Sequence, residues 1–363
     1  MKRILVLTVF CILGLSLLMA QDFSRYVDPR IGSEGLGRTF PGPCMPYGMA
    51  KPGPDAVSMP NAGWAPMPEP VKGFSQMHVS GTGGGQKYGN ILIQPFLDAG
   101  EIIQKRVDEK IALGYYACTF ENGIRTEITA SERCAFYRLD YGRKQKGKLL
   151  IDVATFLGID TIPDKRETQQ YVDSYVTCDG KYAVSGWSTV RGGWNNGGPY
   201  TVYFYLQSDT PLSNCDTPLY NKVKESKTGL DVAFSKSTVN LKIGISHISI
   251  TQARRNIPSC GFDAQLKNVR KTWNGKLGKI EISGTEKQKR MFYTALYHTM
   301  LMPVDKSGEN PHFSATPYYD DYYAIWDTYR TSMPLLTLIE EPQQRDMVNS
   351  LLNIYKHDGY MPD

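Results

Sequence analysis

The stretch YAIWDTYRTSMPLL, residues 323–336, places an aromatic, an acidic and a basic side chain close together in an otherwise apolar run. Trp326, Asp327 and Arg330 lie among Ile, Tyr, Met and Leu residues, which predicts a buried helix. An acid and a base at this spacing form an ion pair on a helix without any further role. They could instead bind a sugar, because an indole ring packs on sugar faces and a carboxylate accepts hydroxyl hydrogen bonds. The residues alone leave both interpretations open.

Three carboxylates gather around this stretch, on Asp320, Asp321 and Asp327. A glycosidase needs two carboxyl groups, about 5 Å apart for retention of configuration or roughly 6.5–9.5 Å apart for inversion. Asp327 could equally cap the helix or pair with Arg330, and the residues alone favour that structural role. No second acid in the sequence identifies itself as a catalytic partner.

A glycine-rich segment, HVSGTGGGQKYGN, spans residues 78–90. It lacks the GxxxxGK[ST] spacing of a phosphate loop, because Lys87 is not followed by Ser or Thr. Strand and turn signals surround it in place of a βαβ unit, which disfavours a dinucleotide site. A wide turn with positive φ angles is the favoured interpretation, and a backbone lining a polar ligand site is the alternative. His78, at its start, is the histidine that we select as a candidate site residue.

Trp64 lies in the sequence NAGWAP, whose turn-forming residues predict an exposed loop. An exposed indole could stack on a sugar ring or simply cover part of the surface. Neither HExxH nor GxSxG occurs, so zinc hydrolysis and a serine nucleophile are disfavoured. His298, on an apolar helical face, is predicted to be a core histidine.

The elements that must position these residues change character about two thirds of the way along the chain. Before that point, β-branched and aromatic runs are bounded by turn signals, which predicts an antiparallel β-sandwich. After it, helical spacing dominates, with Thr285 as an N-cap, Pro342 near the start of the last helix and Gly359 after its end. The fold class is therefore mainly β with helices at the C-terminus. The predicted divisions are a signal peptide (1–20), a β-sandwich (21–255), a linking helix and short strand (256–285) and the opening helices of a second domain (286–363).

The beginning of the chain, MKRILVLTVFCILGLSLLMAQ, has a basic start, an apolar stretch and then Ala20, which is typical of a secretory signal peptide. Cys11 is not preceded by the small residues of a lipid-attachment site, so cleavage near Ala20 is favoured over lipidation. Export to the periplasm or the medium is expected, with no membrane insertion after cleavage. The other six cysteines contain no CxxC spacing, which disfavours zinc, and no disulfide pairing is assigned.

The composition is that of an ordinary globular protein, with 41% hydrophobic and 21% charged residues. A formal net charge of +5 without a run of Lys or Arg gives no electrostatic signature of nucleic-acid binding.

Four long segments in this order resemble glycoside hydrolase family 92, the calcium-dependent exo-acting α-mannosidases. The resemblance runs from about residue 26 to residue 363. Its segments are YVDPRIGSEGLGRTFPGPCMPYGMAKPGPD, GFSQMHVSGTGGGQKYGNILIQP, KQKRMFYTALYHTMLMP and AIWDTYRTSMPLLTLIEEPQQRDMVNSLLNIYKHDGYMP.

The resemblance implies a sandwich packed against an (α/α)6 barrel, with the site between them and calcium as cofactor. It implies hydrolysis of terminal α-mannosides, of the α-1,2 type and on glycans of the N-glycan type, with inversion. Trp326 would then line the mannose ring, Asp327 would accept its hydroxyl hydrogen bonds, and Arg330 would orient Asp327 or reach the sugar. His78 and the glycine-rich turn would form the sandwich's edge of the same cleft, and Trp64 would contact the leaving sugar.

The chain departs from the family pattern in two places. The segment from Gly83 to Gln86 is richer in glycine, and Arg38 stands where a histidine is common. The family's general acid glutamate, general base aspartate and main calcium ligands are expected beyond Asp363, so no catalytic residue or metal ligand is assigned here. The 363-residue polypeptide alone is accordingly expected to be inactive, with poorly folded C-terminal helices. The alternative is a secreted carbohydrate-binding sandwich without hydrolytic activity.

Overall fold

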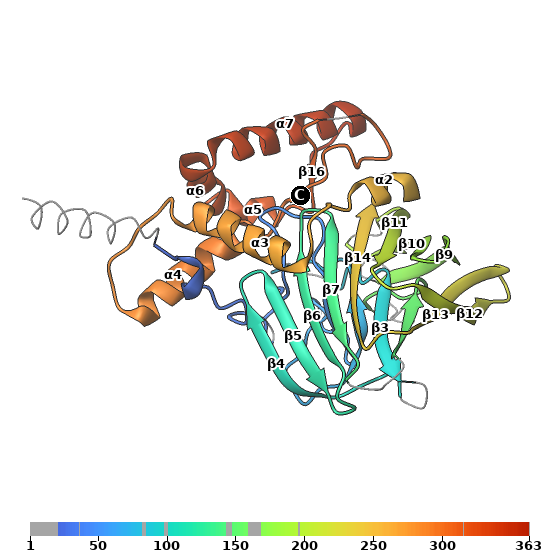
Figure 1. The fold of residues 1–363 in the computed structure, drawn as a ribbon. Coiled ribbons are helices and arrows are strands. Elements are labelled where there is room, and N and C mark those ends of the chain that lie inside the picture. The colour runs from blue at the N-terminus through green and yellow to red at the C-terminus, as the bar shows by residue number, and fades with distance from the viewer. Residues whose placement is uncertain are drawn as a thin grey trace, which may run out of the picture.

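The computed structural model describes residues 21–35, 37–81, 85–97, 101–142, 147–158, 168–194, 197–314 and 316–362. The predicted signal peptide lies outside these residues. Figure 1 shows two β-sheets packed together, with most of the helices gathered above them in this view. This arrangement confirms the prediction of antiparallel sheets followed by helices.

The first sheet has six strands in the order β1-β2-β3-β8-β13-β12, and every neighbouring pair is antiparallel. Two of its inner strands, β3 and β8, have consecutive buried residues, which means that both faces of the sheet are covered there. The strands are β1 (Gly53–Ala56), β2 (Val71–Ser75), β3 (Leu92–Leu97), β8 (Gly147–Asp152), β12 (Leu212–Asn221) and β13 (Ser226–Phe234).

The second sheet has eight strands in the order β4-β5-β6-β7-β14-β11-β10-β9, again antiparallel throughout. Its strands are β4 (Arg106–Ala112), β5 (Tyr115–Phe120), β6 (Arg125–Ala130), β7 (Cys134–Asp140), β9 (Gln169–Cys178), β10 (Ala183–Gly192), β11 (Tyr200–Ser208) and β14 (Thr238–Ser246).

One hydrophobic core lies between the two sheets. Phe74 from β2 contacts Tyr116 from β5, with ring centroids 6.1 Å apart, and the ring of Tyr137 from β7 lies 6.4 Å from the same phenylalanine. Aliphatic side chains of both sheets, such as Ile93 and Ile128, complete this core with no exposed surface. Face-to-face packing of this kind defines a β-sandwich.

A second core lies under the helices and includes part of the Pro- and Gly-rich segment 39–55. The Trp273 indole N–H donates to the carbonyl of Cys44 at 2.8 Å, and the Trp273 ring lies 4.6 Å from that of Tyr297. Trp273 is on α3 (Phe262–Leu277) and Tyr297 is on α4 (Glu286–His298). The segment therefore fixes both helices against the sandwich.

Helix α3 and the shorter α2 (Ile250–Arg255) cover the outer face of the eight-stranded sheet. Gly114 allows the close approach of α3, because a Cβ at this position, where φ is +69°, would lie 2.3 Å from Val269. The short strand expected after α3 is absent, and the described residues 278–284 form turns and irregular backbone. A 3-10 turn, Ser24–Tyr26, packs against α4 through the stacked rings of Tyr26 and Tyr293.

The last part of the chain contains a small ladder, β15 (Val304–Asp305) with β16 (Tyr319–Asp320), followed by three helices. Residues 323–336 do not form the single buried helix that their composition predicts. They divide into one turn, α5 (Ile325–Thr328), and α6 (Ser332–Ile339), because Pro334 has no N–H and is tolerated only in the first turn of a helix. Helix α7 (Glu341–Asp358) has Pro342 near its start and Gly359 in the left-handed conformation at its end, as predicted.

The described helices include none that is long and apolar enough to cross a membrane.

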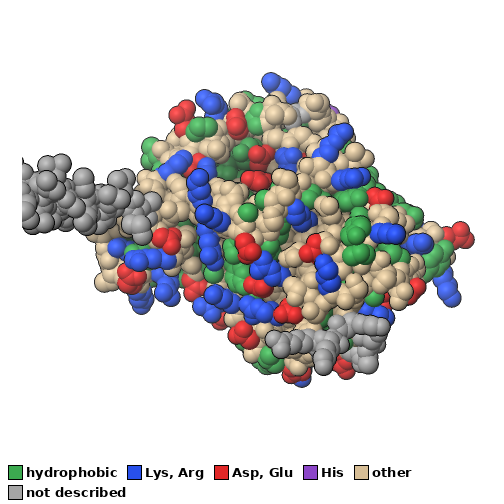
Figure 2. All heavy atoms as spheres, in the orientation of Figure 1, with side chains coloured by type: hydrophobic (Ala, Val, Ile, Leu, Met, Phe, Trp, Pro, Cys, Tyr) green, Lys and Arg blue, Asp and Glu red, His purple; other side chains and the backbone are tan. Residues whose placement is uncertain are grey.

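Helix α7 buries Met347 and Ile354 but exposes an apolar stripe of Val348, Leu352 and Tyr355. Figure 2 shows basic and acidic side chains interspersed over the face that it presents.

Candidate functional site

Trp326, Asp327 and Arg330 lie on or just after the exposed turn α5. Trp326 is 56% exposed, and the side chains of Asp327 and Arg330 are 71% and 59% exposed. A guanidinium nitrogen of Arg330 lies 3.4 Å from Asp327 Oδ1 and also donates to the carbonyl of Trp326 at 2.5 Å. The expected ion pair is present, but it contributes little to stability because both partners are well solvated. An indole face, a carboxylate and a guanidinium are therefore all accessible to a ligand here.

Tyr323 connects this turn to the start of the glycine-rich segment. Its hydroxyl donates to the carbonyl of His298 at 3.1 Å, and a Cβ on Gly81 would lie 3.5 Å from its ring. Gly81 has a φ of +67°, and its N–H donates to the carbonyl of Arg38 at 2.7 Å. The segments around residues 81 and 323 are thus in contact across the boundary between sandwich and helices. Residues 82–84 lie outside the described part of the chain.

The side chain of His78 is completely buried. Its Nδ1 lies 2.7 Å from the carbonyl oxygen of Lys51, and its Nε2 lies 2.8 Å from Asp55 Oδ1. The ring also stacks on Phe40, with centroids 4.9 Å apart. Gly63 is required beside it, because a Cβ there would lie 2.5 Å from Nε2. These contacts fix the backbone that leads into the glycine-rich segment.

Trp64 is buried, and the prediction of an exposed tryptophan is wrong. Only 3% of it is exposed, and its indole N–H donates to Glu109 Oε1 at 3.1 Å. Glu109 also accepts from Arg106 and from the hydroxyl of Tyr116. The turn-forming neighbours did identify a loop, but this loop packs its tryptophan into the sandwich core. In this position Trp64 offers no face to a leaving sugar.

Asp320 and Asp321 form a structural cluster with Lys306. The Lys306 ammonium lies 2.9 Å from a carboxylate oxygen of each aspartate and donates to the Tyr88 hydroxyl at 2.9 Å. The Tyr88 hydroxyl in turn donates to Asp321 at 2.7 Å. Desolvation raises the pKa of Asp320, but the attraction of Lys306 outweighs it and lowers that pKa to about 2. Of the three aspartates in this region, Asp327 is the one left without a buried partner.

This cluster includes residues that the sequence analysis missed. Tyr88 belongs to the sandwich and the aspartates to the segment before α5, so Lys306 holds the two parts together. Lys87 was also missed: its ammonium lies 5.1 Å from the Trp194 ring and 5.3 Å from the Tyr200 ring. Desolvation lowers its pKa. The only signal in the sequence was the Lys-Tyr pair one residue after the glycine run.

The described residues contain no group of three or more His, Cys, Asp and Glu side chains that could hold a metal ion. Calcium prefers six to eight oxygen ligands, several of them carboxylates. The acids near α5 do not fit that requirement, because two of the three are paired with Lys306. We therefore assign no step to calcium.

Comparison with known proteins gives the same family for both parts of the chain. The model of the glycosyl hydrolase family 92 N-terminal domain matches residues 26–246, and that of the family 92 catalytic domain matches residues 250–363. A curated relative, described as an uncharacterized secreted glycosidase of Arthroderma benhamiae, is 28% identical over 85% of this chain and 45% of its own length.

Solved structures agree in fold. An inverting family 92 mannosidase of Bacteroides thetaiotaomicron superposes with a TM-score of 0.74 at 25% identity, over 94% of this chain and 49% of the other. A family 92 α-mannosidase of the same organism gives 0.78 at 24% identity, over 93% and 50%. The chain spans about half the length of these proteins. Together, the two family models cover almost all of the residues that the structure describes, and the chain belongs to glycosyl hydrolase family 92.

Proposed function

We propose that the protein containing this chain is an exo-acting α-mannosidase that removes terminal α-mannosides, of the α-1,2 type, from glycans of the N-glycan type with inversion. The observation that carries the proposal is the family 92 match over both the sandwich and the helical segment. The structural neighbours are mannosidases, and one of them was solved in complex with mannoimidazole. Mannose is therefore the sugar that we assign to the candidate site.

The group on α5 supplies what a terminal mannose needs for binding. The exposed ring of Trp326 can pack on a sugar face, and the Asp327 carboxylate can accept hydrogen bonds from two adjacent hydroxyls. Arg330 either orients Asp327 or donates to the sugar, and its 3.4 Å separation from Asp327 is compatible with both. His78 acts indirectly, because its buried contacts position the glycine-rich backbone next to Tyr323.

Proton transfer is assigned to residues outside the described part of the chain. Inversion needs a general acid and a general base on opposite sides of the sugar. Asp320 and Asp321 are poor candidates because both are paired with Lys306. We propose that residues 21–363 alone release no mannose, and that calcium is required but is bound by other residues. Both statements are supported by the family resemblance and by the share of the relatives that this chain spans.

The setting that we propose is the periplasm or the medium. The signal-like beginning of the sequence supports export, and the curated relative is described as secreted. A disulfide between Cys178 and Cys215 adds physical support, because such bonds persist in oxidising compartments.

Release of mannose from α-linked mannobioses tests the proposal on the full-length protein. Proton NMR of the first product identifies the anomer, and β-mannose is expected from an inverting enzyme. The Asp327→Asn variant should lose on the order of 100-fold or more in kcat/KM, since a sugar hydroxyl then lacks its charged acceptor. Residues 21–363 should give no release, and neither should the full-length protein after chelation of calcium.

Asp108→Asn is the matched control. Asp108 is also an exposed acid weakly paired with an arginine, at 3.9 Å from Arg125 and with 68% of its side chain exposed, but it lies on β4. Its substitution should leave kcat/KM unchanged. Equal activity in both variants would remove Asp327 from the site. No mannose release by the full-length protein from any linkage would favour the carbohydrate-binding module instead.

A further inference from the structure

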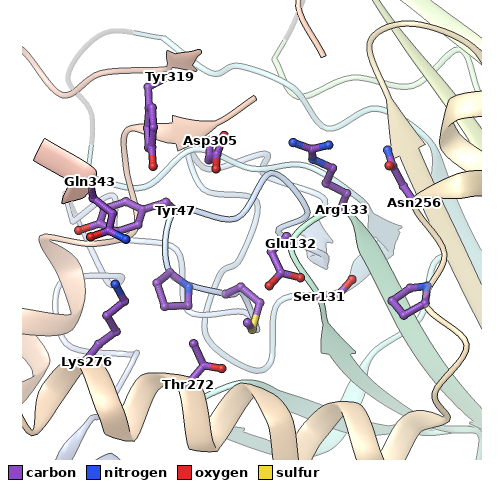
Figure 3. Close-up of a pocket in the computed structure, with 13 residues that line it drawn as sticks. Tyr47, Ser131, Glu132, Arg133, Asn256, Thr272, Lys276, Asp305, Tyr319 and Gln343 are labelled. Carbon is purple, nitrogen blue, oxygen red and sulfur yellow. The ribbon is translucent and has the colours of Figure 1, made fainter. Parts of the chain in front are cut away.

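A pocket separate from α5 lies where the sandwich, α3 and the C-terminal segment meet (Figure 3). Its volume is about 440 Å³, within the usual range of roughly 300–1,000 Å³ for small-ligand sites. Three parts of the chain form its walls: the 45–47 segment, the 131–133 turn between β6 and β7, and α3. Gln343 of α7 and the β15–β16 ladder close one end, as Figure 3 shows.

The ladder separates this pocket from the Lys306 cluster. Asp305 and Tyr319 are paired across the two strands and line the pocket. Lys306, which directly follows β15, and Asp320, the last residue of β16, belong instead to the cluster beside α5. Because successive residues of a strand point to opposite faces, the two groups face opposite ways. The pocket is therefore a site of its own.

Tyr47 provides the clearest sign that the pocket is built for a polar ligand. It is only 4% exposed, and its hydroxyl has no hydrogen-bond partner among the described residues. Burial, together with the neighbouring Glu340 and Tyr319, raises the pKa of Tyr47 above its usual range, so the hydroxyl stays a neutral donor. A buried hydroxyl without a partner costs free energy, and a ligand oxygen would satisfy it.

The other lining groups indicate which ligand would fit. Tyr47 and Tyr319 form an aromatic wall, with ring centroids 6.3 Å apart and planes at 76°. Figure 3 shows Gln343 beside Tyr47 at one end of the pocket and Glu132 near its middle. Aromatic rings, an amide and a carboxylate that accepts from hydroxyls are the groups that recognise a sugar.

The basic groups of the lining do not create an anion site. The Lys276 ammonium is paired with Glu340, and Arg133 is paired with Glu309 at 3.7 Å. Both of these partner carboxylates are completely buried. With the cations compensated in this way and Glu132 present, an acidic ligand would meet net repulsion.

We propose that this pocket is a second saccharide site, which binds a neutral sugar residue through the Tyr47 hydroxyl, the Tyr47–Tyr319 wall and the Glu132 carboxylate. The proposal does not depend on hydrolysis at α5. In a glycan-processing protein such a site would hold a branch of the substrate distant from the cleaved bond.

Isothermal titration tests the proposal on the full-length protein carrying Asp327→Ala, which removes the carboxylate of the candidate site at α5. The probes are two neutral sugars, methyl α-mannoside and methyl β-galactoside, and one of them should bind. Tyr47→Phe deletes only the hydroxyl and should weaken this binding about fivefold, and Glu132→Gln about tenfold, since the latter removes a charge-assisted hydrogen bond. Glu101→Gln, on an exposed glutamate that does not line the pocket, should change nothing.

Binding of neither probe tighter than about 10 mM would overturn the proposal. Binding that Tyr47→Phe and Glu132→Gln both leave unchanged would do the same, because it must then occur elsewhere. Should Tyr47→Phe lower the melting temperature strongly, Glu132→Gln on its exposed side chain still decides the outcome. A protein that binds sugar in this way but releases no mannose would contradict the proposed function and leave the second site standing.

Discussion

A buried histidine, His247, and a partly buried one, His298, make the stability of the protein sensitive to mild acid. Desolvation, assisted by the nearby Lys306, lowers the pKa of His247 to about 4, and desolvation also lowers the pKa of His298 to about 4. His247 faces further charges, Asp321 and Glu309, which raise its pKa without offsetting the effect of burial. Its Nδ1 lies 2.9 Å from the carbonyl oxygen of Thr201, while its Nε2 has no partner among the described residues. The neutral imidazole is therefore the form that fits the fold.

His247→Gln should make the free energy of unfolding less dependent on pH. Between the unfolded pKa of about 6.5 and the folded value of about 4, the unfolded state binds more protons, so stability falls as the pH falls through this window. The loss from His247 between pH 6.5 and 5 should be about 1.6 kcal/mol. Urea unfolding at both pH values measures it, and the exposed His312→Gln is the control. A loss in His247→Gln as large as in the wild type would contradict the assignment.

At the level of single residues, local composition did not reveal which side chains would be buried. The resemblance selected Trp326 and Asp327, and the structure brings their segment next to the glycine-rich one through Tyr323. It gave no indication that His78 and Trp64 would be buried, because burial depends on the long-range partners Asp55 and Glu109. Partners of this kind are set by the tertiary fold and not by local composition.

Helix ends are the elements that the sequence predicted best, and α4 provides a direct test. The Thr285 side chain accepts from the Gln288 N–H, and the Gln288 side chain accepts from the Thr285 N–H, which completes a capping box. Thr331 is also an N-cap threonine, at the start of α6, but its side chain makes no capping hydrogen bond. Both threonines are exposed.

Thr285→Ala should lower the free energy of unfolding by about 1 kcal/mol, because the Gln288 N–H at the start of α4 loses its side-chain acceptor. Thr331→Ala should have almost no effect, since no cap is lost. The comparison is made by urea denaturation with the slope m held in common. An equal change in the free energy of unfolding of the two variants would show that the helix propensity of alanine, and not the loss of the cap, determines the effect.

Two features are not apparent from local sequence patterns, and they share a physical cause. Strand β12 is mostly exposed, contains Pro218 and lies at a sheet edge, where proline is tolerated and an alternating apolar pattern is not needed. The break between α5 and α6 depends on Pro334, whose effect the apolar run around it concealed. Local patterns report which face of an element is buried, and both of these segments have little buried surface.

At the scale of the whole molecule, the contacts between the two sheets differ in kind from those between the sandwich and the helices. The large core between them, built from buried strands of both sheets, could be anticipated from the alternating apolar runs. The contact of sandwich with helices depends on a few specific groups, such as Lys306 with Tyr88 and Trp273 with Cys44. The division of the chain at residues 255 and 285 remains a prediction.

The Cys178–Cys215 disulfide connects the two sheets covalently. Cys178 ends β9, the edge strand of the eight-stranded sheet, and Cys215 lies on β12, the edge strand of the six-stranded sheet. Figure 1 shows β9, β12 and β13 together at one side of the sandwich. The bond therefore joins two edges that no backbone ladder connects among the described strands.

Replacing both cysteines by alanine should destabilise the sandwich by up to about 4 kcal/mol, because the bond closes a loop with a sequence separation of 37 residues and restricts the unfolded chain. Residual structure in the unfolded chain reduces the effect of the bond, so we expect the measured free energy of unfolding to fall by about 2–4 kcal/mol. Urea unfolding of the double variant gives the number, and Cys260→Ala, at a free cysteine, is the control. Adding a reductant to the wild type should reproduce the loss and leave the double variant unchanged. If reductant destabilises both proteins equally, the effect does not come from this bond, and the edges of the sheets are held by packing alone.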